Sequence, residues 1–232
     1  RQLYYGVIMK LSENTISVLK NFATINQNLL IREGNTLTTM SAMKNIVAQA
    51  EVEETFPKEI AIYDLNEFLS SLSLFSNPLL QFGENSVLIV EENNDYNALK
   101  YFYSDPSVVT TPSKSITMPE TEVNFNLKSS DLTKLKRAAG VIGAPDMSLT
   151  QQGQDVMLSV CDKKNDTANT YSLDVDTNGT NSDNYRFYFK VENLKLIDGD
   201  YTVAVSSKNI SHFKNGQVEY WIALEPDSTY EA

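Results

Sequence analysis

The stretches REGN at residues 32–35 and QQGQ at residues 151–154 decide the fold, because they place two similar glycine turns 119 positions apart. Other landmarks recur at nearly the same spacing. Acid-proline pairs follow aromatic strand-like segments at 105–106 and 225–226, which are 120 positions apart. A repeat of this length is too long for one unit of a solenoid and has the size of a small domain. The sequence therefore predicts two domains of similar build.

Apolar residues at helical spacing predict four helices, two in each half. Ser or Asp, the residue types that cap helix N-termini, opens or directly precedes three of them. The two capping serines are 118 positions apart, which repeats the spacing of the glycine turns. The expected helices, with their caps, are 12–26 (Ser12), 65–75 (Asp64), 130–142 (Ser130) and 191–197.

Most of the remaining sequence consists of short strand-like segments separated by Gly, Asn and Asp turns. Hairpins are expected around Gly34 and Gly153. Helices do not alternate with single strands, which argues against a parallel sheet. The predicted fold class is therefore α+β, with two similar domains that each contain antiparallel sheets and two helices. Strands are expected at 29–31, 37–40, 60–63, 79–82, 87–90, 99–103, 123–127, 147–162 (the second hairpin), 169–175, 185–190, 201–206, 210–213 and 217–224.

A change of composition marks the boundary between the halves. Residues 105–121 are rich in Ser, Thr and Pro and hold few large apolar side chains, as extended connectors do. We therefore expect domain 1 at 9–104 and domain 2 at 122–232. Met9 is the expected start of the folded chain, and residues 1–8 are expected to be an N-terminal extension outside the fold.

The composition of the 232 residues restricts the class of protein. Hydrophobic residues make up 41% of the chain, which is enough to build cores. The single cysteine excludes an internal disulfide and suits a reducing compartment. No apolar run is long enough to span a membrane, and no signal peptide is evident. The net charge of −11 argues against nucleic-acid binding only if the charge is spread evenly.

We find no constellation of residues that predicts catalysis. His212 is the only histidine, Cys161 lies in an apolar segment, and no cluster of metal ligands or phosphate-binding loop is present. A hydrolase that uses Asp64 and Asp198 is an alternative, but Asp64 fits a helix cap and Asp198 a turn. We therefore expect a protein that is not an enzyme, with no cofactor and no metal.

The charge is not spread evenly. Residues 128–142 carry a net charge of +3 and the rest of the chain carries −14. A basic helix on an acidic protein predicts a patch that binds a polyanion, and an ordinary solvated helix face is the alternative. The basic residues of this segment are Lys128, Lys134, Lys136 and Arg137.

The repeat extends the basic pattern to other predicted helices. Lys20 lies on the outer face of the first helix, and Lys10 stands just before it. Lys195 lies on the short fourth helix. The second helix departs from the pattern, because it has no Lys or Arg and carries Glu67.

Several motifs resemble the sliding clamps of T-even-type bacteriophages, in the same order from Met9 to the C-terminus. They are MKLS at 9–12, LKNFATIN at 19–26, AIYDLN at 61–66, DPSVV at 105–109, ALE at 223–225 and DST at 227–229. The resemblance implies the DNA clamp fold and a processivity factor for DNA polymerase. Three subunits would close into a ring around duplex DNA, with twelve helices lining the hole.

The resemblance also implies partners and a location. The partners would be duplex DNA bound without sequence preference, the phage DNA polymerase, a clamp loader and late-transcription factors, with no membrane involved. The location would be the cytoplasm of the infected bacterial host. An acidic virion structural or assembly protein that kept the same fold is the alternative, and the basic helix argues against it.

The resemblance assigns three groups of site residues. The DNA-contacting residues would be Lys10, Lys20, Lys128, Lys134, Lys136, Arg137 and Lys195. Subunit contacts would join edge strands near 98–103 and 169–175, including Tyr101 and Tyr171. A pocket for the hydrophobic tails of partner proteins would include Val108, Val109, Ile116, Leu224 and Pro226. The alternatives are surface lysines, ordinary strand tyrosines and local packing. Lys136 and Arg137 are both expected to be exposed.

Overall fold

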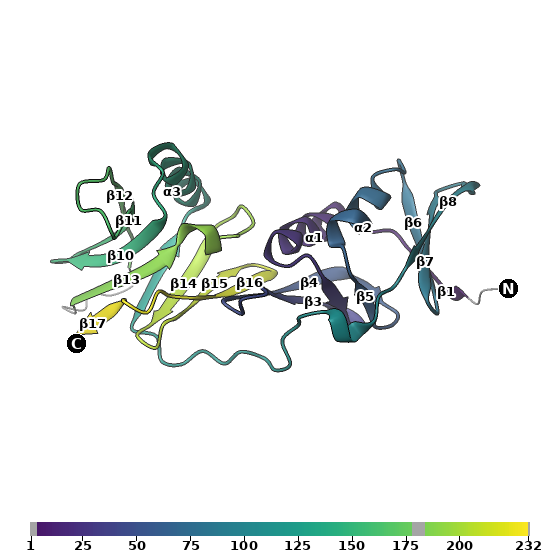
Figure 1. The fold of residues 1–232 in the computed structure, drawn as a ribbon, viewed down its shortest axis with the longest axis horizontal. Helices are drawn as coiled ribbons and strands as arrows, with labels where there is room; N and C mark the ends of the chain where they lie inside the picture. Colours follow the sequence, from purple (N-terminus) through teal and green to yellow (C-terminus); the bar gives the residue numbers. More distant parts are fainter. Residues whose placement is uncertain (1–3, 178–183, 232) are drawn as a thin grey trace. The chain divides into compact units, whose positions relative to one another are not determined.

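The computed structural model describes residues 4–177 and 184–231. The chain forms two compact units, which divide between Lys114 and Ser115, inside the expected connector. Figure 1 shows the ribbon of both units. Each unit is built from antiparallel strands with helices packed on them.

From Tyr4 onward, unit 1 contains two α-helices, and Figure 1 shows them side by side on one side of β3 and β4. Its sheets are the four-stranded β1-β6-β7-β8, the pair β2-β5 and the hairpin β3-β4. The elements are β1 (Tyr4–Met9), α1 (Glu13–Ile25), β2 (Leu29–Ile31), β3 (Gly34–Met40), β4 (Ile46–Phe56), β5 (Ile60–Ile62), α2 (Leu65–Leu72), β6 (Pro78–Gly83), β7 (Ser86–Glu91), β8 (Asn94–Phe102) and the 3-10 turn η1 (Pro106–Val108).

Local capping fixes both helices of unit 1, as predicted. The Ser12 hydroxyl accepts a hydrogen bond from the Thr15 amide at 3.1 Å, and Asp64 accepts one from the Glu67 amide at 3.0 Å. Leu19 and Phe22 of α1 are fully buried, so the amphipathic pattern points to the core as expected. Side-chain acceptors of this kind satisfy amides that the first helical turn leaves unpaired.

A carboxylate from a distant strand also holds the start of α1. Glu54 of β4 accepts hydrogen bonds from the Ser12 amide and the Thr15 hydroxyl. Burial alone would raise the pKa of the Glu54 carboxyl, but these hydrogen bonds outweigh it and hold the pKa below its ordinary value of 4.5. A lowered pKa means that the folded state favours the charged carboxylate, so ionised Glu54 stabilises unit 1.

We therefore expect Glu54→Gln to lower the free energy of unfolding in a pH-dependent way. The difference in the free energy of unfolding between the variant and the unmodified protein should have its full size at pH 7. It should shrink as pH falls below about 4.5, where the carboxylate becomes protonated. Urea denaturation at several pH values measures it, with the exposed Glu51→Gln as the matched control. A difference that stays constant between pH 7 and pH 3 would contradict this role.

The described part of unit 2 contains one α-helix, which packs on β11 and β12 (Figure 1). Its strands form the sheet β12-β11-β10-β13-β17 and the sheet β16-β15-β14-β9. The elements are β9 (Val123–Leu127), α3 (Ser129–Ile142), β10 (Asp146–Gln152), β11 (Asp155–Cys161), β12 (Tyr171–Val175), β13 (Asn184–Lys190), the 3-10 turn η2 (Val191–Asn193), β14 (Tyr201–Ser206), β15 (Ile210–Asn215), β16 (Val218–Ala223) and β17 (Thr229–Glu231).

The prediction of a second helix in unit 2 is wrong. Residues 191–197 form only the 3-10 turn η2 followed by irregular chain. Leu194 and Leu196 are both buried, and residues two apart cannot face the same side of an α-helix. In addition, the Ile197 amide donates to the Tyr220 hydroxyl at 3.1 Å, which fixes the segment after η2 to β16.

Two other expectations about the strands are corrected. The hairpin at Gly153 forms as predicted, with β10 paired to β11. The hairpin expected at Gly34 does not form, because β2 pairs with β5 and β3 pairs with β4. Residues 1–8 are not wholly outside the fold, because β1 begins at Tyr4 and pairs with β6. The sequence also gave no indication of β17, which is three residues long.

Candidate nucleic-acid interface

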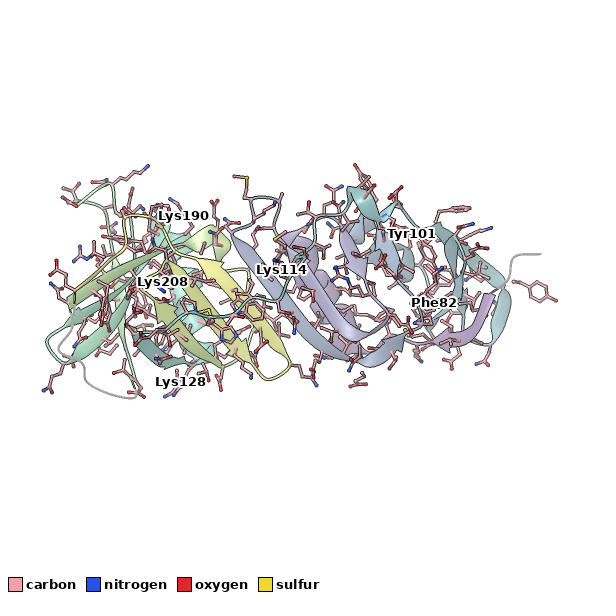
Figure 2. All side chains as sticks on the ribbon, turned by 90° about the horizontal axis from the view of Figure 1, so that it is seen from below. Phe82, Tyr101, Lys114, Lys128, Lys190 and Lys208 are labelled. Atoms are coloured by element: carbon pink, nitrogen blue, oxygen red, sulfur yellow. The ribbon has the colours of Figure 1, made fainter. Side chains whose placement is uncertain are left out.

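The helix α3 presents the basic face that the sequence predicted. Leu132, Leu135 and Ala139 are buried, which leaves the opposite side of the helix in solvent. Lys134 and Arg137 on that side are exposed. Lys128, at the N-cap, is exposed as well, and Figure 2 places it on the opposite side of unit 2 from Lys190. Three cations at one helix therefore remain available to a polyanion.

Lys136 does not belong to this exposed set, which corrects the expectation for it. Its side chain is half-buried, and its ammonium donates a hydrogen bond to the carbonyl of Leu196 at 3.2 Å. Burial lowers the pKa of the Lys136 ammonium, and the charge of Asp198 opposes that shift. Lys136 thus fixes α3 to the chain after η2, and Arg137 carries the exposed charge.

The N-terminus of α3 is capped from elsewhere in the chain. Ser130 was the expected cap, but the N-cap is Lys128, which makes no side-chain capping bond. Instead, the Asp200 carboxylate accepts a hydrogen bond from the Ser129 amide at 2.7 Å. A carboxylate at this position also compensates the positive end of the helix dipole.

The other predicted DNA-contacting lysines have different environments. Lys20 is exposed on α1. Lys10 forms an ion pair with Glu92 at 3.2 Å, and because both side chains are exposed the pair contributes less than about 1 kcal/mol. Lys195 is half-buried between two buried leucines. The exposed side of α2 carries Glu67 and no cation, as the sequence indicated.

The two segments predicted for subunit contacts are edge strands, but their tyrosines differ. β8 is the last strand of its sheet, and β12 is the last strand of the other. Tyr171 is exposed on β12. Tyr101 is buried in its own unit, where its ring contacts Phe68 and its hydroxyl donates to the Asp64 carbonyl at 3.2 Å. Its side chain is therefore part of the core and not of an exposed edge.

The residues predicted for a partner-tail pocket are divided between the two units. Val108 is half exposed, whereas Val109 is buried against Leu30 and Ala61 in unit 1. In unit 2, Leu224 is buried, Ile116 is half-buried and Pro226 is exposed. Val109 and Leu224 thus have packing roles within their own units.

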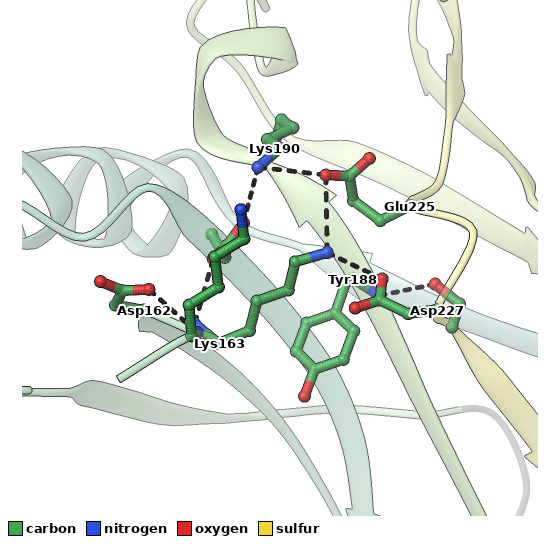
Figure 3. Close-up of polar contacts among 9 residues, drawn as sticks. Asp162, Lys163, Tyr188, Lys190, Glu225 and Asp227 are labelled. Carbon is green, nitrogen blue, oxygen red and sulfur yellow. Dashed lines mark hydrogen bonds and ion pairs between the residues drawn. The ribbon is translucent and has the colours of Figure 1, made fainter. Parts of the chain in front are cut away.

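An ion-pair network that the sequence did not reveal holds the C-terminal segment on β13 (Figure 3). Lys190 lies 3.1 Å from Glu225 and 3.4 Å from Asp146, which is almost completely buried. Lys163 lies 2.7 Å from Asp227 and 3.6 Å from Glu225. The hydrogen bond to Glu225 raises the pKa of the Lys190 ammonium, and the hydrogen bond from Lys163 lowers the pKa of the Asp227 carboxyl. Such contacts between residues far apart in sequence leave no local pattern.

Two of the residues considered for catalysis have structural roles. Asp64 caps α2, and His212 stacks on Trp221 with ring centroids 5.0 Å apart. Burial lowers the pKa of the His212 imidazole despite nearby Glu219. Among residues 4–177 and 184–231, no group of three or more His, Cys, Asp or Glu residues could hold a metal ion. Within the same residues, no helix is long and apolar enough to cross a membrane.

Comparison with known proteins agrees with this arrangement. Residues 10–101 match the family described as DNA polymerase processivity factor, and residues 124–226 match the family described as gp45 sliding clamp, C terminal. The sliding clamp of Vibrio phage KVP40 is 34% identical over 223 residues, which cover 94% of this chain and 99% of that protein. The sliding clamp of Escherichia phage RB69 is 30% identical over 231 residues, which cover 96% and 100%.

The fold is also that of a cellular protein. The crystal structure of Proliferating Cellular Nuclear Antigen from Entamoeba histolytica superposes with a TM-score of 0.68, covering 97% of this chain and 100% of that one, at 14% sequence identity. The two halves of the chain, the basic helix and the phage relatives lead to one assignment. The chain belongs to the sliding clamp family of DNA polymerase processivity factors.

Proposed function

We propose that this chain is the subunit of a ring that encircles duplex DNA and tethers the phage DNA polymerase to its template. The exposed cations Lys128, Lys134 and Arg137 on α3 carry this proposal, because they belong to a protein with a net charge of −11. Contacts from such cations to phosphates hold no sequence information, so the ring can slide. The acidic remainder discourages DNA from binding outside the hole.

The mechanism is topological and needs no catalytic group in the chain. A polymerase bound to a closed ring leaves the template only when the ring opens or the polymerase releases it. In this proposal three copies form the ring, and each brings α1, α2 and α3 to the hole. Nine α-helices and three η2 turns would then line it, instead of the twelve helices that the resemblance implied.

The proposed partners follow from the same role. A clamp loader opens the ring, the polymerase binds it, and late-transcription factors use it as a mobile co-activator, all in the cytoplasm of the infected host. Val108 and Pro226 are the exposed members of the residues proposed to receive partner tails. Hydrophobic tails bind such positions by removing apolar surface from water.

The oligomeric state tests the proposal first. Native mass spectrometry over a range of protein concentrations is expected to show trimers that dissociate to monomers on dilution. Because edge-strand contacts are small interfaces, we expect dissociation at low concentration without loss of the folded monomer. A monomer at every concentration, or a dimer as the largest species, would contradict a three-membered ring.

A further inference from the structure

The exposed cations of α3 are not neutralised within the described part of the chain. Lys134 and Arg137 are exposed on the helix, and Lys128 is exposed at its N-cap. None of the three forms an ion pair with another described residue, whereas Lys163 and Lys190 of the same unit are paired with carboxylates. The positive charge of α3 therefore remains available to a ligand outside the subunit.

The exposed side of α2 has the opposite character. Glu67 is its only charged residue, and the other exposed side chains of the helix, Asn66 and Ser70, are neutral. Large apolar side chains are exposed next to both ends of the helix, Tyr63 before it and Leu74 after it. This side of α2 offers a phosphate no cation and one carboxylate that repels it.

The charge of α1 lies between that of α2 and that of α3. Glu13 and Lys20 are its only charged residues, and both are exposed, so the helix carries no net charge. Lys10, which precedes the helix, is paired with Glu92 at 3.2 Å. The two helices of unit 1 together thus expose one cation and two carboxylates, of which Glu67 is the second.

This uneven charge has a direct consequence in the proposed ring, where all three α-helices line the hole. At physiological ionic strength, salt screens exposed charges over about 8 Å, so each phosphate responds mainly to the helix that it touches. A phosphate at α3 meets cations, and a phosphate at α2 meets an anion. The duplex is therefore attracted to only some of the helices that surround it.

We propose that the DNA contact of each subunit is concentrated on α3 and that Glu67 prevents α2 from forming a second contact. This inference rests on the proposed ring and identifies which of its helices hold the duplex. Three copies then hold the DNA at three separate places instead of around the whole hole. Fewer phosphate contacts have to break when the ring moves, which favours sliding over tight binding.

The salt dependence of DNA binding tests the proposal, because it counts phosphate contacts. A short labelled duplex is titrated at several salt concentrations with protein concentrated enough to form trimers, and fluorescence anisotropy measures the affinity. Lys134→Gln should make the plot of log affinity against log salt shallower by at least about 0.9, the value of one phosphate contact. Lys20→Gln should have a smaller effect. Glu67→Lys should make the plot steeper by at least about 0.9, because it creates a contact that α2 lacks.

Glu51→Lys is the matched control for Glu67→Lys. Glu51 is exposed on β4, and its neighbours Ala50 and Val52 are buried, so its side chain points away from the core that the helices cover. The control makes the same change of charge and should leave the salt dependence unaltered. Sedimentation velocity shows whether each variant still assembles, and circular dichroism shows whether it is folded.

The outcomes separate this proposal from the proposed ring. If the unmodified trimer binds the duplex but Lys20→Gln changes the salt dependence as much as Lys134→Gln, the contact is not concentrated on α3. If Glu67→Lys leaves the salt dependence unaltered, or Glu51→Lys steepens it equally, the role of Glu67 is wrong. An unmodified protein that stays monomeric, or that does not bind the duplex at low salt, would instead overturn the proposed ring itself.

Discussion

Polymerase stimulation by the variant Lys134→Glu with Arg137→Glu is expected to fall at least tenfold, while its fold stays intact. Both side chains are exposed on α3, so the substitutions should cost roughly 0.5 kcal/mol or less each. In a three-membered ring they replace six cations by six anions at the DNA, and phosphate contacts contribute additively to the affinity. Primer extension on a singly primed circle, with the clamp loader present, measures the length of product.

A matched control separates this effect from net charge. Lys164 and Lys208 are exposed in loops of the same unit that do not belong to α3. Lys164→Glu with Lys208→Glu changes the charge by the same amount and should stimulate the polymerase normally. Lys136→Glu is a poor test, because the hydrogen bond from Lys136 to Leu196 would be lost as well. Full stimulation by the α3 double variant would refute the role of this face.

Replacing Lys190 by methionine is expected to lower the free energy of unfolding by about 3 kcal/mol. Asp146 is almost fully buried, and the substitution removes the ammonium 3.4 Å from its carboxylate. A buried charge that loses a charged partner costs several kcal/mol. The partial exposure of Lys190 and the hydrogen bond that Asp146 still accepts from the Lys163 amide at 3.1 Å place the effect at the lower end. The loss should appear in urea denaturation of the full chain.

The pair of exposed Lys214 and half-buried Glu219, 3.7 Å apart, provides the control. Lys214→Met removes a similar contact, but the ammonium is solvated and the carboxylate is not fully buried, so the free energy of unfolding should change by less than about 1 kcal/mol. If Lys190→Met lowers the free energy of unfolding no more than Lys214→Met does, the network in Figure 3 contributes little to holding the C-terminal segment.

The sequence predicted the features that depend on local chemistry. The capping residues Ser12 and Asp64 predicted two helices, and the turn at Gly153 predicted a hairpin. The basic face of α3 followed from composition alone. These signals are contained within a few residues, so neighbours far along the chain do not alter them.

Features that depend on distant partners could not be predicted. Gly34 has a turn sequence similar to that of Gly153, but β2 pairs with β5 instead of β3. The helical spacing of α3 predicted an exposed Lys136, but the segment after η2 covers its side chain. Tyr101 lies on the predicted edge strand, but its side chain is buried against Phe68 of α2 in the core of unit 1.

Encirclement is the central claim, and release from linearised DNA tests it most directly. The protein is loaded onto nicked circular DNA by its clamp loader, isolated with the DNA by gel filtration, and then treated with a restriction enzyme that cuts the circle once. The account predicts that the protein stays on the circle and leaves once the DNA has ends. Retention on the linear product to the same extent as on the circle would show ordinary binding and contradict a ring.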